Sequence, residues 1–102
     1  MGAIEFFTTA TGLDLDTAFS TARDEAAWER GHGGYTGTVA EKGEVTLFDE
    51  PRRGEAAALA RAEELIRAGD PRIDDKWGPA GALPLTTDSG DEGWLLFGFA
   101  AY

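Results

Sequence analysis

The C-terminal run 94–102, Trp-Leu-Leu-Phe-Gly-Phe-Ala-Ala-Tyr, constrains the fold of this chain more than any other stretch. Successive side chains of a β-strand point to opposite faces of its sheet. In this run both alternating sets of side chains are apolar. A strand that is apolar on both faces is typical of the interior of a sheet. The run therefore predicts a strand in the middle of a sheet.

Hydrophobic periodicity and turn residues predict the elements around this strand. We expect helices over 14–30 and 55–68, strands over 3–9, 35–40 and 44–48, and a short strand over 82–86. Pro84 has no backbone N–H to donate, so the last of these is expected at a sheet edge. Glu41-Lys42-Gly43 is expected to form a hairpin between the two middle strands, and 70–81 a long irregular segment.

The resulting order, β-α-β-β-α-(β)-β, predicts a single α+β domain over 1–102. The simplest topology is a ferredoxin-like, split βαβ two-layer sandwich, in which both helices cover one face of a mostly antiparallel sheet. Such a sheet leaves one face without helices, although its strands carry aromatic residues. We expect that open face to be covered by the segment 70–90 or by a second subunit, which would make a homodimer.

The charge of the chain excludes several classes of partner. The sequence has 19 Asp and Glu against 9 Lys and Arg, a net charge of −10 and a pI of about 4.3. Such a field repels nucleic acids and anionic membranes. A basic protein partner and mimicry of nucleic acid stay open, beside the simpler explanation of solubility. The chain has no cysteine, signal peptide or apolar span, so we expect a cytoplasmic protein.

The most unusual stretch is 31–42, Gly-His-Gly-Gly-Tyr-Thr-Gly-Thr-Val-Ala-Glu-Lys, which holds four of the fourteen glycines and the only histidine. Glycines let other groups approach the backbone closely, and exposed N–H groups in such a turn can bind an anion. The alternative is a purely structural connection, with Gly31 ending the helix. The stretch matches no known phosphate-binding motif.

Together with Lys76-Trp77-Gly78-Pro79-Ala80-Gly81, this stretch resembles a family of small uncharacterised proteins associated with actinobacteria and their phages. The resemblance covers most of the chain. It carries no established activity, so no catalytic role is transferred to any residue. The link to phages would favour a role in inhibiting a host or evading its defences.

These observations predict a non-catalytic binding module for a small anionic, nucleotide-like ligand. The ligand would be held by the glycine-rich segment 31–37 and the loop 74–81, through His32, Gly33, Gly34, Tyr35, Thr36, Thr38, Lys42, Lys76 and Trp77. We assign no catalytic residue, metal ligand or cofactor. The alternative is an acidic protein-interaction or inhibitor module, such as a nucleic-acid mimic. A small enzyme that uses His32 ranks behind both.

Overall fold

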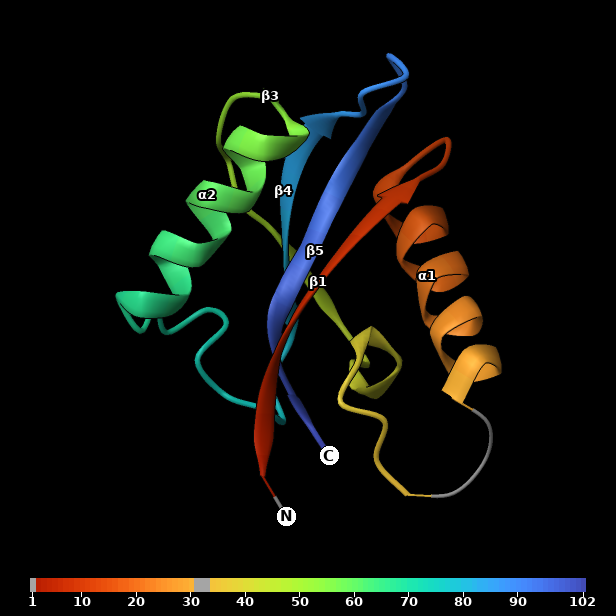
Figure 1. Cartoon of the computed structure of the whole chain (residues 1–102), viewed down its shortest axis with the longest axis vertical. Helices are drawn as coiled ribbons and strands as arrows, with labels where there is room; N and C mark the ends of the chain where they lie inside the picture. Colours follow the sequence, from red (N-terminus) through yellow and green to blue (C-terminus); the bar gives the residue numbers. More distant parts are fainter. Residues whose placement is uncertain (1, 31–33) are drawn as a thin grey trace.

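The computed structural model describes residues 2–30 and 34–102 (Figure 1). Its elements are β1 (Ala3–Thr11), α1 (Leu15–Arg30), a 3-10 helix (Val39–Glu41), β2 (Val45–Leu47), β3 (Arg53–Gly54), α2 (Glu55–Arg67), β4 (Ala80–Thr86) and β5 (Glu92–Ala101). The expected α+β class with a mostly antiparallel sheet is confirmed. Among the described residues, neither helix is long and apolar enough to cross a membrane.

The sheet has the strand order β1-β5-β4-β2, and β3 also pairs with β4. β5 runs antiparallel to both β1 and β4, which confirms its predicted place inside the sheet. β2 and β3 are short and run parallel to β4. Most of the sheet is therefore formed by the two long antiparallel ladders, and the short parallel strands form the edge opposite β1.

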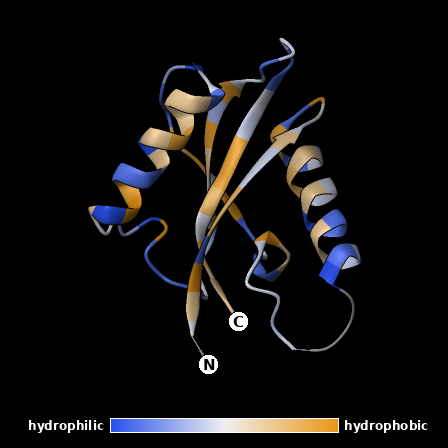
Figure 2. Cartoon of the chain, viewed as in Figure 1, coloured by the Kyte–Doolittle hydropathy of each residue, from blue (hydrophilic) through white to orange (hydrophobic). Residues whose placement is uncertain are grey.

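The two helices lie on opposite faces of the sheet, so the expected two-layer, ferredoxin-like arrangement is wrong in this respect (Figure 1). Phe6 and Leu96 pack in one core with α1, whereas Leu95 and Phe97 pack in the other core with α2. Figure 2 shows the hydrophobic residues that run through β5 between the helices. Because adjacent residues of β5 are apolar on both faces, each face needs a cover. The described sheet has no helix-free face, which removes the reason for expecting a homodimer there.

Pro84 lies in an interior strand and not at the expected edge. β2 pairs with Ala80–Ala82, and β3 pairs with Leu85 and Thr86, so the two short strands leave a break in the ladder at positions 83 and 84. The Ala82 carbonyl accepts from Phe48 on the β2 side, so Pro84, two residues further on, also directs its nitrogen away from β5, and its missing N–H removes no bond to β5. The interrupted edge explains why a strand with a proline can still lie beside β5.

The segment after α1 does not form the expected strand over 35–40 or the hairpin at 41–43. The chain makes bends and then the 3-10 helix Val39–Glu41, after which β2 pairs in parallel with the distant β4. Gly37 adopts a φ of 67°, outside the strand region, and its N–H donates to the carbonyl of Ala101 at 2.8 Å. The other predicted elements, over 3–9, 14–30, 44–48 and 55–68, are confirmed within two residues at each end.

Candidate functional site

The two irregular segments singled out in the sequence lie against each other. The rings of Tyr35 and Trp77 meet edge to face, with their centroids 5.4 Å apart and their planes at 69°. The ammonium of Lys42 reaches the same loop, where it donates to the carbonyls of Asp75, Lys76 and Gly78 at 3.3, 3.1 and 3.0 Å. The predicted site residues His32 and Gly33 lie outside the described residues.

Lys42 is a structural residue, which corrects its expected role in holding an anion. It is fully buried, and its three carbonyl contacts match the three donors of an ammonium group. Burial lowers the pKa of Lys42, and the nearby carboxylate of Asp75 partly opposes this effect. The side chain therefore fastens the loop 75–78 to the end of the 3-10 helix and has no donor left for a ligand.

Thr36 and Thr38 are also occupied by contacts within the protein. The hydroxyl of Thr36 donates to Glu41 Oε2 at 2.8 Å, and its backbone N–H donates to the same oxygen at 2.9 Å. Thr38 caps the 3-10 helix, since its Oγ1 accepts from the N–H of Ala40 at 3.2 Å. This network shapes the turn that carries Tyr35, and it uses polar groups that the sequence had assigned to a ligand.

Tyr35, Lys76 and Trp77 remain accessible, and we refer to these three residues as the aromatic platform. Tyr35 is 48% exposed and Trp77 is 58% exposed, which is high for large aromatic side chains. The Lys76 ammonium lies 5.3 Å from the centroid of the Trp77 ring, a distance typical of a cation–π contact. Gly34 precedes the platform with a φ of 75° and open space around it.

The surroundings of the aromatic platform are acidic. A hollow of about 330 Å³ beside Trp77 is lined by Gly43, Glu44, Gly78 and Pro79. Lys76 lines a second hollow, of about 430 Å³, together with Asp74, Asp75, Ala3 and Phe99. Each hollow thus combines aromatic surface with at least one carboxylate.

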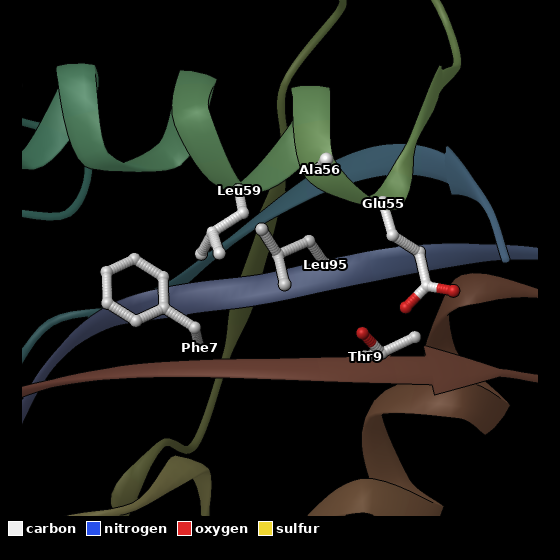
Figure 3. Close-up of a pocket in the computed structure, with 6 residues that line it drawn as sticks. All are labelled: Phe7, Thr9, Glu55, Ala56, Leu59 and Leu95. Carbon is white, nitrogen blue, oxygen red and sulfur yellow. The ribbon is translucent and has the colours of Figure 1, made fainter. Parts of the chain in front are cut away.

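A separate apolar groove lies between α2 and the sheet (Figure 3). Its volume is about 290 Å³, and its lining residues are Phe7, Thr9, Glu55, Ala56, Leu59 and Leu95. Leu59 of α2 is 39% exposed at this groove. The groove was not predicted from the sequence, because it depends on how far α2 stands from β1.

Among the described residues, no group of three or more His, Asp or Glu side chains is arranged to hold a metal ion. No family model matches the chain, and no curated protein or solved structure matches it either.

Proposed function

We propose that this chain is a non-catalytic protein-interaction module that binds a basic partner through the aromatic platform. The observation that carries the proposal is the pairing of two exposed aromatic rings, Tyr35 and Trp77, inside an acidic surface. Tyrosine and tryptophan are enriched at the centres of protein interfaces. Host inhibition, which the resemblance to phage-associated proteins favours, is one use of such a module.

The electrostatics favour a cationic side chain at this site over an anion. Lys42 donates to loop carbonyls, Thr36 to Glu41 and Thr38 to the Thr36 hydroxyl, so Lys76 is the described cation left beside the rings. Asp74 and Asp75 line a hollow with Lys76, and Glu44 lines the hollow beside Trp77, in a chain with a net charge of −10. An arginine or lysine of a partner would displace Lys76 from the Trp77 face and gain a carboxylate neighbour at the same time.

A small anionic, nucleotide-like ligand is the second candidate. Lys76 favours it, since its ammonium could pair with a phosphate while the base stacks on Trp77. Gly34, with its exposed backbone beside Tyr35, offers an approach for the same group. Catalysis through His32 stays behind both candidates.

The two candidates separate in a titration with opposite probes. An arginine-glycine peptide and a nucleoside triphosphate are each added to the protein at low and at physiological salt, with binding measured by calorimetry. We expect the peptide to bind, its affinity to fall with salt, and the triphosphate to give no heat. The reverse pattern would support the anionic ligand and contradict the proposal.

The variant Trp77→Ala tests whether the aromatic platform is the binding surface. Loss of a cation–π contact and of the ring area should weaken peptide binding about fivefold or more. Trp28→Ala is the matched control, because Trp28 is 86% exposed on α1. Equal weakening by both variants would show that the peptide binds the acidic surface without using the platform.

A further inference from the structure

β1 is a long strand at the edge of the sheet. It pairs with β5 through nine consecutive residues, from Ala3 to Thr11, and no other described strand lies beside it. Proteins usually protect such edges with proline, lysine, a bulge or a very short strand. The β1 sequence, Ala-Ile-Glu-Phe-Phe-Thr-Thr-Ala-Thr, has neither proline nor lysine, and its register with β5 is unbroken. This edge is therefore a template on which another strand can pair.

The backbone groups that face outward follow from the register. Gly2 and Tyr102 exchange both of their hydrogen bonds, at 3.4 and 3.3 Å, and in an antiparallel ladder such pairs alternate with pairs that do not bond to each other. Counting along the register, the residues whose N–H and C=O point away from β5 are Ala3, Glu5, Phe7, Thr9 and Thr11. All of them are exposed except Phe7, which is half-buried.

A groove lies on each side of this edge. Towards α2 is the apolar groove of Figure 3, which is walled by Phe7 and Leu59. Towards α1 is a hollow of about 180 Å³, lined by Thr8, Ala22, Glu25, Ala26, Glu29, Arg30 and Thr38. Glu25 and Glu29 are one helical turn apart and both are exposed, so they present two carboxylates on the same side of α1.

We propose that β1 binds an extended segment of another protein in which apolar residues alternate with lysine or arginine. A strand paired with Phe7 would place that residue's side chain in the groove beside Leu59. Its two neighbours would point to the other face, within reach of Glu25 and Glu29. The apolar residues of such a segment would face the apolar groove, and its basic residues would face Glu25 and Glu29.

Charge selects this occupant over a second copy of the chain. A second copy would bring another net charge of −10 and repeat Glu25 and Glu29 in the same hollow. A basic segment instead neutralises these carboxylates, with Arg30 at the margin of the hollow. The inference does not depend on the aromatic platform, and Trp77→Ala should leave binding at β1 unchanged.

Amide hydrogen exchange, followed by NMR, tests the proposal on the whole chain. The probe is a seven-residue peptide that alternates lysine with leucine, and its control has the same composition in blocks. We expect the alternating peptide to slow exchange at Glu5, Phe7 and Thr9 about tenfold or more, while the block peptide does not. No slowing at these amides, or equal slowing by both peptides, would overturn the proposal.

Two variants locate the contacts. Thr9→Pro removes an outward N–H without removing a bond to β5, so the peptide should bind about tenfold more weakly than it binds Thr9→Ala. Glu25→Gln with Glu29→Gln should also weaken binding and reduce its salt dependence, whereas Glu63→Gln with Glu64→Gln on α2 should not. If Thr9→Pro fails to fold, the double variant Glu25→Gln with Glu29→Gln provides the test. Unchanged peptide binding to that double variant would overturn the proposal. If the β1 amides are protected without peptide, and more so at higher protein concentration, then a second copy of the chain pairs with β1. That result would contradict our choice of a basic segment as the occupant.

Discussion

Lys42 shows how one residue can join two distant parts of a chain. Its ammonium serves three carbonyls of the loop 75–78, which carries Trp77. A buried carbonyl without a donor is costly, because it has lost its hydrogen bonds to water. The position of the aromatic platform therefore depends on this buried ammonium group.

Lys42→Met should lower the free energy of unfolding by about 2–3 kcal/mol, since three carbonyls lose their donor while the length of the side chain is kept. Denaturant unfolding followed by circular dichroism measures the change. Lys76→Met, at the half-buried lysine of the platform, should cost less than about 1 kcal/mol. Similar losses in both variants would contradict the structural role of Lys42.

Asp70 and Arg72 form an ion pair just after the end of α2. Arg72 Nε and Nη2 donate to the two carboxylate oxygens of Asp70 at 2.9 and 2.7 Å, and the guanidinium lies 3.8 Å from the centroid of the Phe48 ring. The Arg72 side chain, assisted by its backbone N–H, lowers the pKa of Asp70 from 3.8 to about 2. The next residue, Ile73, is buried in the core under α2.

This shift predicts an acid-dependent contribution to stability. Because the folded pKa of Asp70 is below its unfolded value, the contribution is complete above about pH 4 and is lost as the pH falls through about 2. Asp70→Asn should therefore lower the free energy of unfolding by about 1–2 kcal/mol at neutral pH and by much less near pH 2. Urea unfolding of both proteins across this range gives the measurement, and a difference that does not change with pH would count against the ion pair.

Among the helices and strands, the sequence correctly predicted the features that follow from the spacing of residues close together in the chain. The predicted first helix begins at Asp14, whose Oδ1 accepts from the N–H of Thr17 at 2.8 Å, as a helix cap does. β5, apolar on both faces, was placed inside the sheet as observed. These features depend on residues close together in the chain, where spacing and capping leave few alternatives.

The errors concern contacts between distant residues. Pro84 suggested an edge strand, but the break between β2 and β3 accommodates it inside the sheet. The run 35–40 alternates like a strand, yet the Thr36–Glu41 bonds and the contact of Gly37 with Ala101 hold it in turns. The face that each helix covers was also missed, because both faces of β5 are apolar and the pattern alone cannot assign α1 and α2.

The candidate site was predicted in part for the same reason. Unusual composition located both segments, and the contact of Tyr35 with Trp77 joins them. The sequence could not show that Lys42 would be buried, since lysine is almost never fully buried and its charge suggests an exposed role. Once that residue is removed from the ligand set, the balance of charge at the platform becomes acidic, and the favoured partner changes from an anion to a cation.

The whole molecule combines a net charge of −10 with large apolar side chains on its surface. An acidic field attracts basic proteins from a distance and speeds their encounter, but it does not specify how they dock. Docking requires surfaces such as the aromatic platform and the β1 edge. A basic protein that engaged both would gain affinity from two linked contacts, provided that its geometry reached both sites.

The three tryptophan indoles can show whether a basic partner binds at the aromatic platform, because they lie on α1, on the platform loop and on β5. Their Nε1–H signals can be followed by NMR during a titration with the arginine-glycine peptide at low salt. Binding at the platform should move the signal of Trp77 and leave those of Trp28 and Trp94 in place. A stationary Trp77 signal while either of the others shifts would contradict the account.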